Sequence, residues 1–142
     1  MKRQSKKRIE QKKTISGIDA KRREVGDKIY HDPRRAGKHG KPCEGSAFVV
    51  HRCSGRMELN EVIYPRNVFQ KIAPKYWESF FLEWNMSINC GFFHATYGHR
   101  TKFRRWFLER VIRIYTIEKI RAWNNSLPLE EENRIIIDET MS

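Results

Sequence analysis

The chain has 142 residues, and its 29 Lys or Arg against 17 Asp or Glu give a formal net charge of +12 at pH 7. This length has room for one domain. The longest apolar runs, residues 47–50 and 135–137, are too short to span a bilayer, and no apolar segment follows the basic N-terminus as a secretory signal would require. Three cysteines cannot make a fully paired disulfide framework. We therefore expect an intracellular protein, cytoplasmic or nuclear, with no membrane partner.

The first 42 residues differ from the rest of the chain in composition. They hold 15 Lys or Arg and five Asp or Glu, a net charge of 15 − 5 = +10, with few large apolar side chains. Such a segment buries too little apolar surface to offset the entropy of ordering it. The breakers Asp32-Pro33 and the glycines between 37 and 45 follow. We expect a flexible basic arm over 1–42 and a compact α+β domain over 43–142.

A β-hairpin is the first element expected in the domain. Residues 47–50 and 57–64 are two β-favouring runs, and Cys53-Ser54-Gly55-Arg56 between them suits a tight turn. Pro65 has no amide to donate and should end the second strand.

Helices are expected after the hairpin. Apolar residues between 77 and 88 recur at spacings of three and four, which predicts a helix from Pro74 to Gly91. A longer helix is expected from Thr101 to about Asn124, and residues 135–137 are expected to form a C-terminal edge strand. The predicted fold is thus a hairpin packed on two or three helices. Its expected core residues are Trp77, Phe81, Trp106 and Phe107.

The charge of the arm predicts a polyanionic partner, RNA or DNA, with RNA slightly favoured. Lys and Arg neutralise phosphates and release condensed counterions without reading sequence. The alternative is a tail that only improves solubility. The arm residues expected to contact nucleic acid are Lys6, Lys7, Arg8, Lys12, Lys13, Lys21, Arg22, Arg23, Arg34 and Arg35.

A second basic cluster lies within the domain. Between Arg100 and Arg121 there are eight Lys or Arg and two Glu. Cations at a helix N-terminus oppose the helix dipole, and a bound phosphate would compensate for that conflict. A solvated basic face is the alternative. The residues expected to bind phosphate are Arg100, Lys102, Arg104, Arg105 and Arg113.

His94 and His99 are the candidate catalytic residues, because histidine titrates near neutral pH and can act as acid or base in RNA cleavage without a metal. Stacking on a base, phosphate contact, or a solvated loop are alternatives. The sequence favours a non-catalytic nucleic-acid-binding protein with a regulatory, packaging or ribonucleoprotein role. A small metal-independent ribonuclease or toxin is one alternative. A protein-interaction or inhibitor module is another, and a protein partner or homo-oligomer stays open.

The cysteines raise the question of zinc. Cys43 and Cys53 are each followed two residues later by Gly, as in zinc knuckles, and Cys90 and His94 have a workable ligand spacing. A metal site would therefore use Cys43, Cys53, Cys90 and His94, with His39, His51 and His99 also close in sequence. No C-x-x-C pair is complete, so the sequence favours buried free thiols, with no metal and no cofactor.

Overall fold

The computed structural model describes residues 6–141, with side chains described for residues 17–138, 140 and 141. In this part of the chain, five α-helices and two strands form, with short 3-10 helices between them, which confirms the expected mixed α+β class. The elements are α1 (Lys6–Tyr30), β1 (Met57–Glu61), α2 (Arg66–Phe69), β2 (Met86–Cys90), α3 (Gly91–Tyr97), α4 (Thr101–Tyr115) and α5 (Ile117–Ser126). Within residues 6–141 no helix has both the length and the apolar composition that a membrane span requires.

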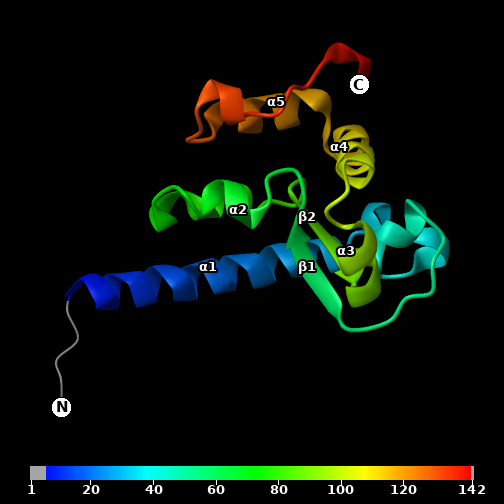
Figure 1. Ribbon diagram of the computed structural model, residues 1–142, viewed down its shortest axis with the longest axis horizontal. Coiled ribbons are helices and arrows are strands. Elements are labelled where there is room, and N and C mark those ends of the chain that lie inside the picture. The colour runs from blue at the N-terminus through cyan, green and yellow to red at the C-terminus, as the bar shows by residue number, and fades with distance from the viewer. Residues whose placement is uncertain (1–5, 142) are drawn as a thin grey trace.

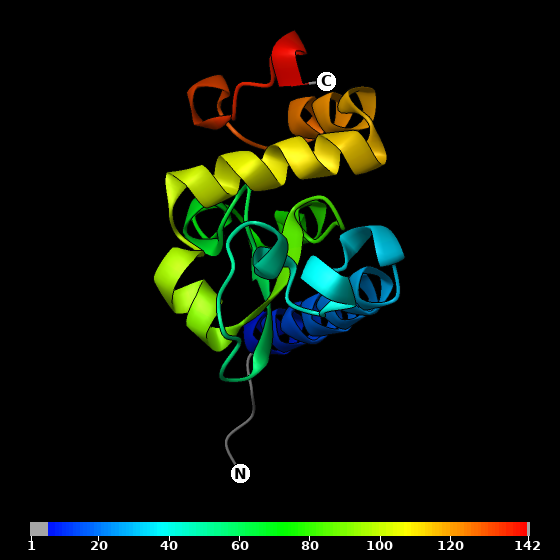
Figure 2. The same cartoon turned by 90° about the vertical axis from the view of Figure 1, so that its right-hand side faces the viewer.

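The hairpin lies in the middle of three layers. Helix α1 runs along one side of β1 and β2, and α4 and α5 lie on the other side, as both ribbon views show (Figures 1 and 2). α3 follows β2 directly and α4 begins a few residues later. α3 therefore begins at the end of the hairpin where Cys90 lies opposite Met57, whereas Arg104 near the start of α4 contacts the Val62 carbonyl at the other end, just after β1.

Strand β1 pairs with β2, which corrects the predicted hairpin. The strands are antiparallel, with Met57 opposite Cys90 and Glu61 opposite Met86. The expected partner, residues 47–50, instead begins with the last residue of a 3-10 helix, Glu44–Ala47, and continues beyond it. The helix expected from Pro74 to Gly91 is replaced by a 3-10 helix, Pro74–Phe80, and by β2.

Burial on both faces explains why the sequence pattern does not predict β2. Four of its five residues are buried, so its sequence lacks the alternation of a half-exposed strand. Asn85, the polar residue before β2, can be buried because its side chain hydrogen-bonds to the backbone. It accepts from the Tyr64 amide at 2.8 Å and donates to the Phe80 carbonyl at 2.8 Å. A buried amide that satisfies the backbone in this way has no signature in local spacing.

Helix α1 carries part of the core, which differs from the expectation of a flexible arm over 1–42. Ile18, Val25 and Ile29 are buried, and the helix contacts β2 and the 3-10 helix Pro74–Phe80. These three residues lie seven and four positions apart and so share one helix face. A narrow stripe is enough to dock the helix, although its average composition is strongly polar.

The expected long helix is divided into α4 and α5. Thr116 between them has φ 84°, which ends the helical path, and its hydroxyl accepts from the Lys119 amide at 3.4 Å to cap α5. The expected edge strand is also absent from the described residues. Ile136 is 83% exposed, and the Ile135 amide donates to the Tyr64 hydroxyl at 2.7 Å rather than to a strand. Of the expected core residues, Phe81 and Phe107 are buried, whereas Trp77 and Trp106 are half-buried.

Candidate functional site

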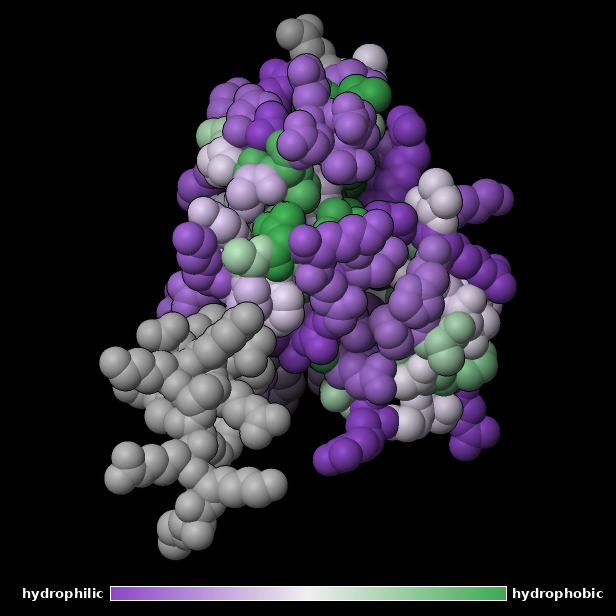
Figure 3. Space-filling view, turned by 60° about the vertical axis from the view of Figure 1, so that its left-hand side comes forward, coloured by the Kyte–Doolittle hydropathy of each residue, from purple (hydrophilic) through white to green (hydrophobic). Residues whose placement is uncertain are grey.

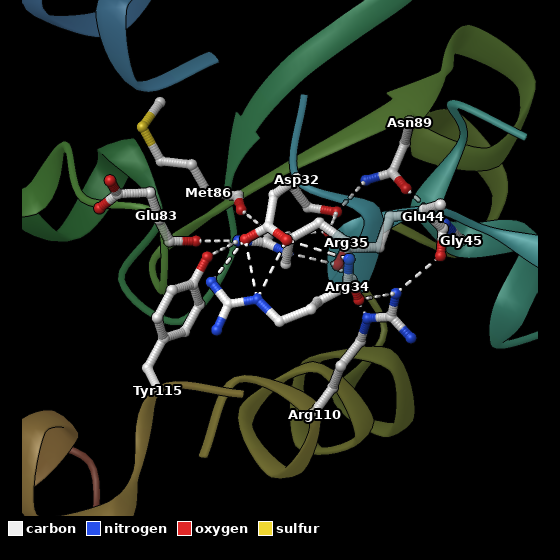
Figure 4. Close-up of polar contacts among 12 residues, drawn as sticks. Asp32, Arg34, Arg35, Glu44, Gly45, Glu83, Met86, Asn89, Arg110 and Tyr115 are labelled. Carbon is white, nitrogen blue, oxygen red and sulfur yellow. Dashed lines mark hydrogen bonds and ion pairs between the residues drawn. The ribbon is translucent and has the colours of Figure 1, made fainter. Parts of the chain in front are cut away.

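Arg35, expected to contact nucleic acid, lies instead at the centre of a buried polar network. It is 2% exposed and forms a bidentate ion pair with Glu44, at 2.6 Å from Nε and 2.7 Å from Nη2. Its guanidinium also donates to the carbonyls of Glu83 and Met86. Figure 4 shows these groups converging from the segment after α1, from β2 and from α4. Arg35 therefore holds the fold together and is not free to bind phosphate.

The same network fixes Glu44 from two further sides. Arg110 of α4 donates to its carboxylate at 2.8 Å, and Ser87 of β2 donates at 2.8 Å. Asn89 accepts from the Gly45 amide at 2.8 Å (Figure 4). Each buried charge is thus paired and hydrogen-bonded, the condition under which burial is tolerated. As a result, the chain around residue 44 is held firmly against β2.

Two other predicted arm contacts are used within the fold. Arg22 lies 3.1 Å from Glu61 and donates to the Leu59 carbonyl at 2.9 Å, which docks α1 on β1. Arg34 hydrogen-bonds to Asp32 and lowers the pKa of that carboxyl.

The structure describes the side chains of only some of the remaining arm residues. Lys21 lies 3.9 Å from Glu24, and Arg23 is exposed. The side chains of Lys6, Lys7, Arg8, Lys12 and Lys13 lie outside the described residues.

The second basic cluster lies largely at the surface. Arg100, Lys102, Arg105 and Arg113 are exposed. Arg104 points inward and donates to the carbonyls of Val62 at 3.2 Å and Ile63 at 3.1 Å, which ties α4 to the end of β1. Four of the five residues are therefore accessible to a ligand, and Arg104 has a structural role.

A pocket of about 420 Å³ opens beside the start of α4. His94 and His99 both line it, with ring centroids 4.7 Å apart. Burial and then the neighbouring His99 charge lower the pKa of His94. Other lining residues are Asn60, Glu61, Arg66, Asn89 and Arg104. The pocket thus combines imidazole, guanidinium and amide groups, which can hydrogen-bond to a phosphate or a base, with the carboxylate of Glu61, which pairs with Arg22 and Arg66.

The three cysteines converge at a different place, and their fourth neighbour is His51. The ligand atoms of Cys43, His51, Cys53 and Cys90 all lie within 4.8 Å of one another. No disulfide joins the cysteines. Three of the four residues named from sequence as metal candidates are therefore together, whereas His94 belongs to the pocket beside α4.

The surroundings of the cluster shift the pKa values of two of its thiols in opposite directions. Burial raises the pKa of Cys43 to about 12. Burial also acts to raise the pKa of Cys90, but hydrogen bonds from the Phe93 and Ser54 amides, together with the contact between its sulfur and His51 Nε2, bring it down to about 7.

Comparisons with known proteins found no match, so the role of the site is inferred from its own chemistry. No protein-family model matches the chain, and no match is found among curated proteins or among solved structures.

Proposed function

We propose that this protein binds nucleic acid without cleaving it, through the surface where α3 meets the start of α4. The observation that carries this proposal is the exposure of Arg100 and Lys102 directly after His99, at the edge of a polar pocket. The first turn of α4 contains no acidic residue, and the side chain of its N-cap residue, Arg100, makes no capping hydrogen bond. Cations beside free helix amides favour a phosphate group.

The polar character of one face of the molecule also favours a charged partner. Figure 3 shows one face of the molecule on which hydrophilic residues predominate and hydrophobic ones form only small patches. Protein interfaces usually have an apolar core, which patches of this kind do not offer on that face. RNA is slightly favoured over DNA because the pocket is of a size and polarity that suit an unpaired base.

Binding of labelled single-stranded RNA at several salt concentrations tests the proposal. The double variant Arg100→Glu, Lys102→Glu should lose several-fold in affinity, because two phosphate contacts are replaced by repulsion. The slope of log K against log salt should become less steep by about 1.4, at about 0.7 for each single-strand contact. Duplex DNA in parallel would show which nucleic acid is preferred.

The matched control is Lys71→Glu, Lys75→Glu, which makes the same change of net charge at two exposed lysines before and within the 3-10 helix Pro74–Phe80. If both double variants lose affinity equally, the binding depends on net charge and the proposed surface is wrong. Affinity that does not respond to salt would favour a protein-interaction module instead.

Metal-independent RNA cleavage is a second candidate, favoured by the His94–His99 pair. A lowered pKa keeps His94 neutral, the form that a general base needs to take a proton from a ribose 2′-hydroxyl. His99 would then act as the general acid for the leaving oxygen. Cleavage of RNA in the presence of EDTA, lost in both His94→Gln and His99→Gln, would support this candidate. Intact RNA after prolonged incubation with the wild-type protein would exclude it.

A further inference from the structure

We propose that Cys43, His51, Cys53 and Cys90 together bind one zinc ion, at a site separate from the pocket beside α4. Three thiols and one imidazole are a ligand set that zinc uses in closed, structural sites. The proposal is independent of nucleic-acid binding, because it rests on these four side chains and their immediate neighbours alone.

The distances from the imidazole nitrogen to the three sulfurs match a tetrahedral zinc site. His51 Nε2 lies 3.6 Å from Cys43 Sγ, 3.5 Å from Cys53 Sγ and 3.4 Å from Cys90 Sγ. With zinc bonds of about 2.3 Å to sulfur and about 2.0–2.1 Å to nitrogen, a tetrahedron places nitrogen and sulfur about 3.6 Å apart. All three observed separations agree with that value to within about 0.2 Å.

The imidazole of His51 is held in the orientation and tautomer that a metal requires. Its Nδ1 lies 2.9 Å from the Val49 carbonyl oxygen, which can only accept, so Nδ1 carries the proton. In the neutral imidazole, the form that binds a metal, Nε2 is therefore the nitrogen without a proton, and it lies within 3.6 Å of all three sulfurs. Metal-bound histidines commonly have their second ring nitrogen fixed by such a contact.

Backbone amides supply the support that thiolates need. The Cys90 amide donates to Cys43 Sγ at 3.3 Å, and the Phe93 amide donates to Cys90 Sγ at 3.4 Å. The rings of Phe92 and Phe93 lie 5.9 Å and 5.1 Å from the His51 ring and cover it. The cluster is therefore polar at its centre and shielded by aromatic side chains, as second-sphere groups shield a structural metal.

The backbone that carries the ligands is shaped for close approach. Gly55, two residues after Cys53, has φ +82° and lies near Gly91, which follows Cys90. A side chain at Gly45, two residues after Cys43, would meet the Phe93 ring at 2.5 Å. Both glycines that follow the first two cysteines are thus required by the fold of this site.

The ligands also come from parts of the chain that the protein already holds in place. Cys43 is next to Glu44, which the Arg35 and Arg110 ion pairs fix, and Cys90 ends β2 and caps α3. The two remaining ligands lie in the loop before β1. Zinc would fasten this loop to the end of the hairpin and so set the position of α3.

Zinc content of the full chain, purified with a reductant and zinc in the medium, tests the proposal. Elemental analysis should give one zinc per chain for wild type and a much lower content for His51→Gln. The control is His94→Gln, which makes the same change at the histidine that spacing alone would choose and should keep the zinc. Cobalt should replace zinc with the intense visible absorption of a tetrahedral thiolate site.

A second measurement on the wild-type protein does not depend on how the variants fold. Titration with a thiol-specific mercurial should release zinc in step with modification of the three cysteines. Wild type without zinc, an equal loss from His51→Gln and His94→Gln, or a mass showing that two cysteines have lost hydrogen to a disulfide would each overturn the proposal.

Discussion

Individual basic residues have different roles that their charge alone does not reveal. Arg35 and Arg104 lie within a few residues of exposed cations, yet both donate to carbonyls inside the fold. The expectation that Arg35 and Arg104 contact phosphate assumed that charged side chains stay in solvent. It fails where a carboxylate such as Glu44 is buried opposite, because each charge then makes burial of the other tolerable.

Replacement of Arg35 by Met should destabilise the protein by about 3–5 kcal/mol, because it leaves Glu44 buried with one ion-pair partner fewer. The remaining contact from Arg110 places the expected value towards the lower end of that range. Urea unfolding followed by tryptophan fluorescence measures the effect.

The neighbouring Arg34 provides the control. Its side chain is 56% exposed and pairs with Asp32, so Arg34→Met should destabilise the protein far less than Arg35→Met. Similar losses for the two variants would contradict the assignment of Arg35 as a structural residue.

Spacing in the sequence selects Cys43, Cys53 and Cys90, which the structure brings together. It also selects His94, which the structure places in the pocket beside α4. Spacing does not select His51, because the contact that identifies this residue is tertiary. It stands two residues before Cys53, close enough in sequence to be considered, but only the return of β2 past residues 43–53 brings Cys90 to it. Local spacing ranks His94 higher because it follows Cys90 by one helical turn.

At the level of elements, the sequence predicts those whose pattern is periodic and half-exposed. The strand β1 and the amphipathic helix α4 lie close to where the sequence places them. β2 and the packed part of α1 do not, for opposite reasons. β2 is buried on both faces and so shows no alternation, whereas α1 buries only a thin stripe that a composition argument averages away.

Two truncations separate the packed part of α1 from the residues before it. Deletion of residues 1–16 keeps Ile18, Val25 and Ile29 and should change the melting temperature little. Deletion of residues 1–40 removes all three, each contributing about 1.5–3 kcal/mol, and also Arg35. That sum is comparable with the whole stability of a small domain, about 5–15 kcal/mol, so the shorter chain should not fold.

Circular dichroism during heating distinguishes the two outcomes. A cooperative transition in the chain that begins at residue 41, at a temperature near that of the full chain, would show that α1 is dispensable. It would restore the expectation of an independent arm.

Across the whole molecule, the net charge of +12 overstates the positive charge available to a partner. Arg22, Arg35 and Arg110 are each held by a carboxylate, and Arg104 by carbonyls. The cations that remain at the surface include Arg100 and Lys102 at the start of α4. They lie beside the pocket that His94 and His99 line. Distribution of charge, more than its total, therefore supports the proposed binding surface.

Zinc should act on the stability of the whole molecule, because its proposed ligands join the loop before β1 to the end of the hairpin. Free zinc at 1,000 times its dissociation constant contributes about 4 kcal/mol, which corresponds to about 10 °C or more in melting temperature for a chain of this size. A strong chelator should therefore lower the melting temperature of wild type and of His94→Gln by that amount, and added zinc should restore both.

His51→Gln serves as the reference for the zinc-free state. It should melt near the temperature of the chelated wild-type protein and should respond little to chelator, because the site that zinc would leave is already incomplete. A wild-type melting temperature that is the same with and without chelator, in protein shown to contain zinc, would mean that the ion does not hold the loop to the hairpin. The buried Arg35–Glu44 pair and the core on α1 would then be sufficient to keep residues 43–53 against β2 without it.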